Sequence, residues 1–403
     1  MELTIASIET LLLIAALVGM VARWLRIPYT VGLVVTGLVL ALFSFAPQIN
    51  LTKDLVFAVL LPPLIFEATL YIRWHELRLN LPVILVLATA GVLLSASLTA
   101  VGMRYVAGWT WQGAALFGIL IAATDPVSVI ATFREAGVHG RLRLLVEAES
   151  LFNDATAAVS LSVLLTFIDG QTLSAGNVIG ETAWTILGGL LVGGMTAGFI
   201  LLLTHRTSDH LIELALSTVV AYGSFLIAEE LHASGVLSTL TAGILIGNFG
   251  LPVSYSDKGR ASLLDFWEFA AFIANSLIFL LIGVREARED FVGAIWPIAA
   301  AIFIVMFGRA AAIYLFSALF AKSRLRVERN HQHVLFWGGL RGALALALAL
   351  GLPPEVESRD QIVTAAFGVV AFSIFVQGLT MTPLLHWLKE VPKHVSKERA
   401  ASE

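Results

Sequence analysis

The sequence Glu-Ser-Leu-Phe-Asn-Asp at residues 149–154 sets four polar side chains inside an apolar run that extends to residue 168. On a helix, Ser150 and Asp154 lie four residues apart on one face, and Glu149 and Asn153 form a second stripe beside it. At about 1.5 Å per residue, Asp154 lies roughly 15 Å from the start of the run, near the middle of a bilayer core about 30 Å thick.

A charged side chain at that depth costs about 2.5–3.5 kcal/mol even on the most lenient scale, so it must face protein or water. The cluster is therefore either a buried structural network of polar groups or a site that handles an ion. Ionisable residues within membrane helices usually mark function, and we favour the second interpretation.

The composition identifies the chain as a polytopic helical membrane protein. Of its 403 residues, 58% are hydrophobic and 13% are charged, whereas an ordinary soluble domain carries about 25% charged residues. The mean hydropathy is +0.87. The sequence has no cysteine, which excludes disulfides and thiolate metal sites. The first apolar run, residues 3–20, lacks the basic start of a signal peptide, and we expect it to be a retained membrane span.

Thirteen apolar runs are long enough to cross a membrane, and we predict an all-α protein with about 13 transmembrane helices. They cover residues 3–22, 30–47, 53–71, 80–102, 111–132, 142–168, 179–203, 209–230, 233–249, 265–284, 293–319, 331–351 and 361–388. With the N-terminus outside, eighteen of the 25 lysines and arginines fall in inner loops and five in outer loops, while Arg309 and Arg341 lie within runs. This bias predicts an outside N-terminus and a cytoplasmic C-terminus.

Two of these runs contain sequences that break a helix. In the fifth run, Pro126 removes a backbone donor and pushes Asp125 out of the helical region, which predicts a new half-helix with Asp125 as N-cap and Pro126 at its first position. In the twelfth, Gly-Gly-Leu-Arg-Gly at residues 338–342 loosens the backbone. Runs five and twelve are seven apart and therefore run in opposite directions. This predicts two inverted six-helix repeats with discontinuous crossing helices 5 and 12, an architecture of transporters.

Among the ionisable residues within the predicted spans, six draw attention: Glu67, Asp125, Glu149, Asp154, Arg309 and Arg341. Left unpaired, they would cost about 18 kcal/mol, more than the roughly 5–15 kcal/mol of a typical net stability. Four carboxylates against two arginines leave two acids without a cationic partner. Such a carboxylate can hold a proton or a small cation, and the oxygens of Asp154, Ser150 and Thr124 suit Na⁺. Competition between the two at an alternately exposed site is sufficient for antiport.

The chain resembles the NhaP-type sodium/proton antiporters of cation:proton antiporter family 1, relatives of the animal sodium/proton exchangers. The resemblance runs over nearly the whole chain. It rests on six motifs taken together: Leu-Pro-Pro-Leu-Ile-Phe-Glu at 61–67, Ala-Thr-Asp-Pro-Val at 123–127, Glu-Ser-Leu-Phe-Asn-Asp at 149–154, Asn-Ser-Leu-Ile-Phe at 275–279, Gly-Gly-Leu-Arg-Gly at 338–342 and Gln-Gly-Leu-Thr at 377–380.

The resemblance implies that Asp154 is the exchanging carboxylate and that Ser150, the main chain at Thr124 and Glu67 complete the Na⁺ site. It further implies roles for a supporting network, in which Asp125 balances the broken helices, Glu149 pairs with Arg341, and Asn153 supports that pair. The transported ions would be Na⁺ and H⁺, with Li⁺ as a further candidate. Neither a cofactor nor a nucleic-acid partner is expected.

The resemblance also implies a homodimer in a prokaryotic plasma (inner) membrane, with a role in pH homeostasis. We expect a dimerisation domain from spans one to three (1–79) and from spans eight to ten with the linker span seven (169–290). The core, or transport domain, would be formed by spans four to six (80–168) and eleven to thirteen (291–390). Residues 391–403 would form a short cytoplasmic tail.

Three alternatives stay open at this point. A K⁺/H⁺ antiporter of the same fold is the first, because ligand types alone do not set the size of the site. An intramembrane aspartyl protease could use Asp125 and Asp154, although the sequence has no Gly-x-Gly-Asp motif. An ion channel would need a continuous pore. Within the antiporter interpretation, the neutral Asn153 beside Asp154 leaves one titrating carboxylate at this position, which predicts electroneutral, one-for-one exchange.

Overall fold

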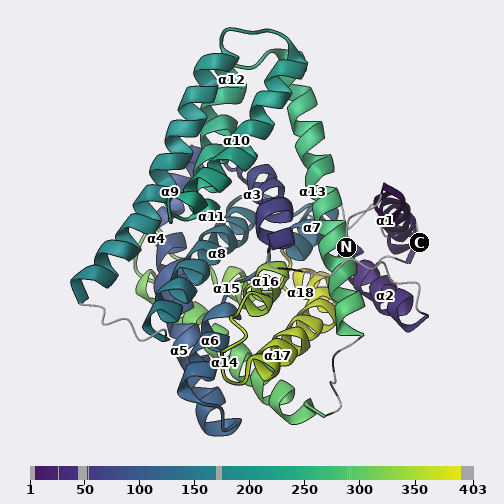
Figure 1. The fold of residues 1–403 in the computed structure, drawn as a ribbon, viewed down its shortest axis with the longest axis vertical. Coiled ribbons are helices and arrows are strands. Elements are labelled where there is room, and N and C mark those ends of the chain that lie inside the picture. Colours follow the sequence, from purple (N-terminus) through teal and green to yellow (C-terminus); the bar gives the residue numbers. More distant parts are fainter. Residues whose placement is uncertain are drawn as a thin grey trace. The chain divides into compact units, whose positions relative to one another are not determined.

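The structure is a computed structural model that describes residues 5–25, 27–43, 52, 54–168, 175–287, 289, 291 and 293–391. Within these residues every regular element is a helix (Figure 1). The chain forms α1 (Ile5–Leu25), α2 (Tyr29–Leu42), η1 (Leu55–Leu60), α3 (Leu61–Leu70), α4 (Trp74–Val86), η2 (Leu87–Gly91), α5 (Val92–Val106), α6 (Trp111–Leu120), α7 (Val127–Ala136), α8 (Arg141–Ile168) and α9 (Ala175–Thr204). It continues through α10 (His210–Glu230), α11 (Gly235–Leu245), η3 (Ile246–Gly250), α12 (Leu251–Val253), α13 (Asp257–Glu286), α14 (Ile295–Leu319), α15 (Arg329–Trp337), α16 (Ala343–Leu350), α17 (Arg359–Phe372), η4 (Ser373–Gly378) and α18 (Leu379–Trp387). The η segments are π-helical turns that continue into the neighbouring helices.

The prediction of an all-α membrane protein is confirmed. Over the described part of the chain, eight helices are long and apolar enough to cross a membrane, and three further apolar helices are shorter. Helical segments fall on all thirteen predicted runs, which is compatible with thirteen crossings, although the count itself stays a prediction. The predicted tail, residues 391–403, lies outside the described residues apart from residue 391.

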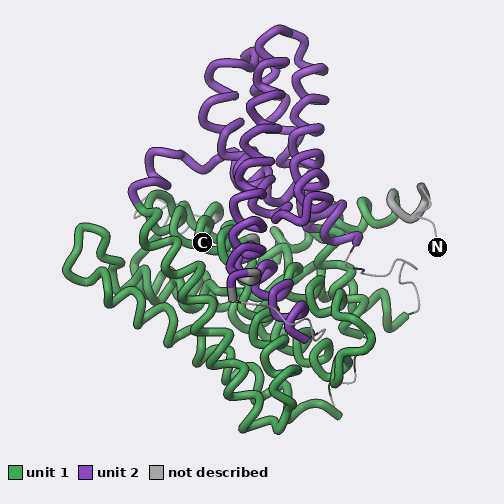
Figure 2. Tube along the Cα trace, turned by 60° about the vertical axis from the view of Figure 1, so that its left-hand side comes forward, with its two compact units in different colours: residues 1–51, 80–153, 276–403 green, residues 52–79, 154–275 purple. Residues whose placement is uncertain are grey.

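The chain divides into two compact units (Figure 2). Unit 1 comprises residues 1–51, 80–153 and 276–403, and unit 2 comprises residues 52–79 and 154–275. The boundary between the units passes through α8, between Asn153 and Asp154. The predicted dimerisation and core domains stay predictions, because compactness says nothing about which parts move or dimerise.

Unit 1 contains both interrupted helices and the continuous helices around them. Here α5 packs against α6 and α14, and α17 packs against α14 and α16. The interrupted pair α6 and α7 lies in the chain between the long helical segments α4–α5 and α8. The interrupted pair α15 and α16 lies between α14 and α17–α18. The hydroxyls of Tyr29 in α2 and Ser276 in α13 lie 2.7 Å apart and tie those helices together. Thr124, Glu149, Ser150, Asn153, Arg309 and Arg341, described below, all belong to this unit.

Unit 2 is built on close packing among α3, α9, α10 and α11. Its core includes the rings of Phe66 and Trp267, whose centroids lie 4.7 Å apart. Where α9 meets α11, a β-carbon at Gly193 would overlap the carbonyl of Ser238, so only glycine permits this approach. Such small-residue contacts are a common way to pack membrane helices.

Candidate functional site

Both predicted helix breaks are confirmed. Residues 121–126 separate α6 from α7, and residues 338–342 separate α15 from α16. The two breaks meet, because the backbone N–H of Asp125 donates to the carbonyl of Leu340 at 2.8 Å. A β-carbon at Gly342 would overlap the carboxylate of Asp125, so the close approach of the two breaks requires glycine there. Breaks predicted from local sequence in two separate runs thus form one structural feature.

One detail of the fifth run was predicted wrongly. The half-helix α7 begins at Val127 with Pro126 as its N-cap residue, whereas we expected Asp125 as N-cap and Pro126 at the first helical position. The carbonyl of Pro126 accepts the first helical hydrogen bond, from the N–H of Ile130 at 2.7 Å. The backbone N–H of Asp125 donates to the carbonyl of Leu340 in the second break.

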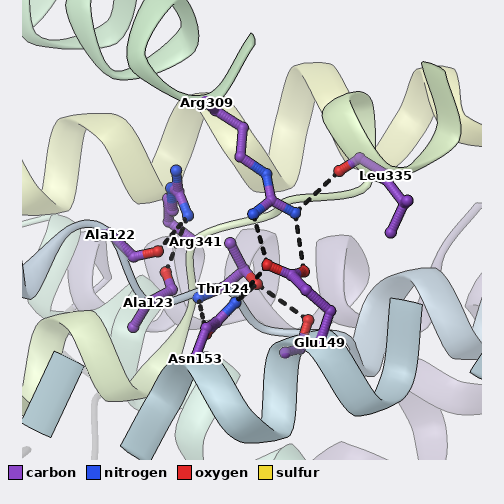
Figure 3. Close-up of polar contacts among 9 residues, drawn as sticks. Ala122, Ala123, Thr124, Glu149, Asn153, Arg309, Leu335 and Arg341 are labelled. Atoms are coloured by element: carbon purple, nitrogen blue, oxygen red, sulfur yellow. Dashed lines mark hydrogen bonds and ion pairs between the residues drawn. The ribbon is translucent and has the colours of Figure 1, made fainter. Parts of the chain in front are cut away.

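Thr124, at the first break, is held by the polar stripe of α8 (Figure 3). Its N–H donates to Asn153 Oδ1 at 3.0 Å, and Asn153 Nδ2 donates in turn to Thr124 Oγ1 and to Glu149 Oε1, the latter at 3.1 Å. The hydroxyls of Thr124 and Ser150 lie 3.0 Å apart. All four side chains are almost completely buried. The break thus carries a dry cluster of hydroxyl and amide groups against one face of α8.

Glu149 forms a buried ion pair with Arg309 of α14. Arg309 Nη1 donates to Glu149 Oε1 at 2.7 Å and Nη2 donates to Oε2 at 2.9 Å, which is the bidentate geometry that planar guanidinium and carboxylate groups favour. A third bond from Nη2 reaches the carbonyl of Leu335 at 3.0 Å, close to the end of α15. The predicted pairing of Glu149 with Arg341 is therefore wrong.

Arg341 bonds to the backbone of the first break. Its Nη1 donates to the carbonyls of Ala122 and Ala123 at 2.9 and 3.2 Å (Figure 3). In an unbroken helix the carbonyl of Ala122 would accept from the residue four positions on, which is Pro126 and has no N–H. The arginine of one break therefore supplies a donor that the proline of the other break removes. A buried carbonyl without such a donor would cost about 1–3 kcal/mol.

The structure brings four of the predicted site residues together. Thr124, Ser150, Asn153 and Glu149 form one hydrogen-bonded cluster. Asp154 follows one turn after Ser150 on the same face of α8 and is 8% exposed.

Glu67 is half-buried on α3, in unit 2. No group of three or more histidine, cysteine, aspartate or glutamate side chains able to hold a metal ion occurs among the described residues. Oxygen ligands for a cation would therefore include hydroxyl and carbonyl groups.

Arg309 is the residue whose part in the site the sequence did not reveal. Charge alone does not distinguish it from Arg341, because both lie within predicted spans. The feature that distinguishes the two arginines is the hydrogen bonding of the backbone. Pro126 leaves the carbonyl of Ala122 without a donor, and Arg341, in the second break, is the arginine placed to provide one. Arg309 is then the arginine that remains for Glu149.

An all-helical membrane protein in which two discontinuous helices meet at their unwound segments belongs to the class of secondary transporters. The comparisons with known proteins agree. A family model described as "Sodium/hydrogen exchanger, transmembrane" matches residues 12–387, and the chain belongs to that family. Membership excludes the aspartyl protease and argues against the channel.

Similar proteins cover most of the chain. The Na⁺/H⁺ antiporter ApNhaP of Aphanothece halophytica is 41% identical over 368 residues, which are 90% of this chain and 70% of that protein. The Na⁺/H⁺ antiporter NhaH of Halobacillus dabanensis is 33% identical over 397 residues, covering 94% and 96% of the two chains. Among solved structures, the sodium proton antiporter MjNhaP1 of Methanocaldococcus jannaschii matches with a TM-score of 0.76 at 20% identity over 97% of each chain. That likeness supports the fold.

Proposed function

We propose that this chain exchanges Na⁺ for H⁺ across the membrane by alternating access, with Asp154 as the carboxylate that binds either ion. The observation that carries the proposal is the arrangement on α8. Glu149 is committed to Arg309, the hydroxyls of Thr124 and Ser150 meet 3.0 Å apart, and Asp154 lies one turn further along the same face as Ser150. Named Na⁺/H⁺ antiporters among the similar proteins support the choice of ions.

In this proposal the residues have separate tasks. Asp154 and Ser150, with the oxygens of Thr124, form the Na⁺ site, and Glu67 is a further candidate ligand. The ion pair of Glu149 with Arg309 holds α8 against α14. Asp125 and Arg341 stabilise the two breaks against each other. When a proton replaces Na⁺ on Asp154, the carboxylate becomes neutral and the cation is released. Opening of the site to the other side then completes a half-cycle.

The test is exchange in proteoliposomes that contain a pH-sensitive dye and a preset pH gradient. Adding Na⁺ should collapse the gradient with the native protein and fail to do so with Asp154→Asn, because the amide cannot trade a proton for a cation. The matched control is Glu230→Gln, which removes an exposed carboxylate at the end of α10 and should leave exchange unchanged. Substantial exchange by a folded, correctly inserted Asp154→Asn protein would exclude the proposed role.

The same assay separates Na⁺ from K⁺. A K⁺/H⁺ antiporter of the same fold is the alternative, and it would collapse the gradient with K⁺ and fail with Na⁺. Li⁺, a hard cation similar to Na⁺, is expected to be transported as well.

One-for-one stoichiometry follows from the same residues. Asn153 is neutral and Glu149 stays ionised against Arg309, so one carboxylate on this part of α8 is left to alternate between a proton and a cation. Each half-cycle then moves the same charge, and a membrane voltage, worth about 2.3 kcal/mol per charge per 100 mV, should not drive the reaction. A K⁺ diffusion potential imposed at equal pH and equal Na⁺ is the measurement. Na⁺-dependent proton movement that reverses with the sign of the voltage would contradict electroneutral exchange.

We also propose that the protein is a homodimer in a prokaryotic plasma membrane, with its N-terminus outside and its C-terminus in the cytoplasm. The dimerisation domain would be residues 1–79 and 169–290, and the moving core residues 80–168 and 291–390. Cross-linking of purified protein in lipid would test the dimer. Accessibility of single cysteines, introduced into this cysteine-free chain at Arg206 and at Arg104, would test the orientation.

A further inference from the structure

The segment between α14 and α15 forms a cavity unrelated to the polar cluster at the helix breaks. Its volume is about 550 Å³, and its lining residues are Arg141, Arg324, Arg326, Glu328, Arg329 and Asn330. Four arginines and one glutamate therefore line the same open depression. All six residues belong to unit 1. Exposed arginines are ordinarily solvated one by one and bind no ligand. A binding site requires that such a group of arginines be held in a fixed arrangement.

Hydrogen bonds from one lining residue fix the backbone of the cavity wall. Arg141, at the start of α8, donates from Nη1 to the carbonyl of Arg326 at 2.7 Å and from Nη2 to the carbonyl of Leu325 at 2.8 Å. Its Nε donates to Asn80 Oδ1 at 2.8 Å, so the guanidinium itself is held in place. Arg141 thus acts as a clamp on the segment that carries the other arginines.

Two amide side chains anchor the rest of the wall. Gln332 Nε2 donates to the carbonyl of Val327 at 2.8 Å, and Asn330 Nδ2 donates to the carbonyl of Leu388 at 3.0 Å. Hydrogen bonds from side chain to backbone on both sides of residue 328 fix the conformation of the cavity wall. The cavity is therefore a built feature of the connection between the two helices.

The remaining arginines have no acceptor within the part of the chain that the structure describes. The side chains of Arg324, Arg326 and Arg329 are exposed and make no hydrogen bond or ion pair with other described residues. Glu328, which is also exposed, makes no ion pair with them. Glu328 is the residue before α15, and its side chain does not cap that helix, so the first N–H groups of α15 add partial positive charge beside the arginines.

From these features we infer that the cavity binds a phosphate group. Guanidinium groups match the oxygens of phosphate in bidentate geometry, and several of them around one fixed hollow favour a ligand with more than one negative oxygen. An anionic phospholipid headgroup is one source, because α14 exposes Leu315 and Leu319 in the last turns before the cavity. In the predicted orientation this is the cytoplasmic side, where basic pockets bind anionic headgroups. A soluble phosphate compound is the other source.

The experiment is calorimetric titration of the full-length protein in a mild non-ionic detergent. The probes are dihexanoyl phosphatidylglycerol, dihexanoyl phosphatidylcholine with the same acyl chains, and inorganic pyrophosphate. The site variant is Arg324→Gln/Arg329→Gln, and the control is Arg206→Gln/Lys258→Gln, which removes two exposed positive charges that the orientation also places on the inner side. Neither variant touches the proposed exchange site, and an unchanged melting temperature without probe shows that each is folded.

We expect phosphatidylglycerol to bind the native protein and the control variant equally, and the site variant at least about tenfold more weakly, because two charge-assisted contacts are lost. Binding of pyrophosphate alone, with the same loss in the site variant, would support the phosphate site and identify its source as soluble. The inference is overturned if neither anion binds, if phosphatidylcholine binds as well as phosphatidylglycerol, or if both variants lose affinity equally. This result is independent of exchange activity, so it stands or falls separately from the proposed function.

Discussion

The ion pair of Glu149 with Arg309 offers the sharpest test of the site, because the sequence predicted a different partner. The perturbations are Glu149→Gln and Arg309→Met, each of which removes a charge with little change in side-chain volume. A third variant, Arg341→Met, removes the arginine that was expected to form the pair. Because these groups are hydrogen-bonded and almost fully buried, their energetic coupling should be measurable.

The magnitude follows from burial. The side chains of Arg309 and Glu149 are 6% and 1% exposed, so loss of either leaves the other charge stranded in a dry environment. Removal of one partner of such a pair costs about 3–5 kcal/mol, whereas loss of both leaves no stranded charge. The double variant Glu149→Gln/Arg309→Met should therefore be much more stable than the sum of the single losses predicts. We expect a coupling energy of at least about 1.5 kcal/mol.

Equilibrium unfolding in mixed micelles of a mild detergent and dodecyl sulfate measures these free energies of unfolding. The matched cycle combines Glu149→Gln with Arg341→Met. Arg341 donates to the carbonyls of Ala122 and Ala123 and makes no hydrogen bond to Glu149, so its coupling should be weaker than that of Arg309. Additivity of Glu149→Gln with Arg309→Met to within about 0.5 kcal/mol would refute the pairing. Stronger coupling to Arg341 would refute it too.

Three further outcomes follow from the breaks and from the proposed exchange. Gly342→Ala should abolish exchange and lower the melting temperature, because the added methyl group overlaps the carboxylate of Asp125, whereas Gly198→Ala, where a β-carbon meets no atom within 4 Å, should do neither. Arg341→Met should destabilise the folded protein by about 1–3 kcal/mol for each carbonyl left without a donor, measured by the same micelle unfolding. The apparent KM for Na⁺ should rise as the pH falls through the range in which the exchanging carboxylate titrates, with the maximal rate little changed. A KM independent of pH would contradict competition for one site.

The helices and both breaks could be predicted from the sequence because each depends on local features. Long apolar runs must be helical in lipid, since no water is present to bond free backbone groups. Pro126 and the three glycines at 338–342 lie in the two segments where a helix is interrupted. The sequence contains no comparable local feature that predicts the π-helical turns η1 to η4. The start of α7 was misplaced by one residue, because the first helical hydrogen bond is accepted by the carbonyl of Pro126 and not by that of Asp125.

The site could be predicted only in part. The spacing of residues 149–154 placed four polar groups on α8, and the structure shows that Glu149, Ser150 and Asn153 are buried around Thr124. Which arginine faces Glu149 could not be read from spacing, because it depends on how α14 packs beside α8. A balance of charges considers only carboxylates as acceptors for an arginine. Backbone carbonyls, which are uncharged, are not part of it.

The two arginines balance the buried charges in different ways. Arg309 donates to Glu149 and to the carbonyl of Leu335, whereas Arg341 donates to the carbonyl of Ala122, which Pro126 leaves without a donor, and to that of Ala123. Arg341 therefore brings a full positive charge to the unwound segments while its donors satisfy neutral groups. The exchange proposed at Asp154 therefore does not require Arg341 as the ion-pair partner of Glu149, because Arg309 takes that place.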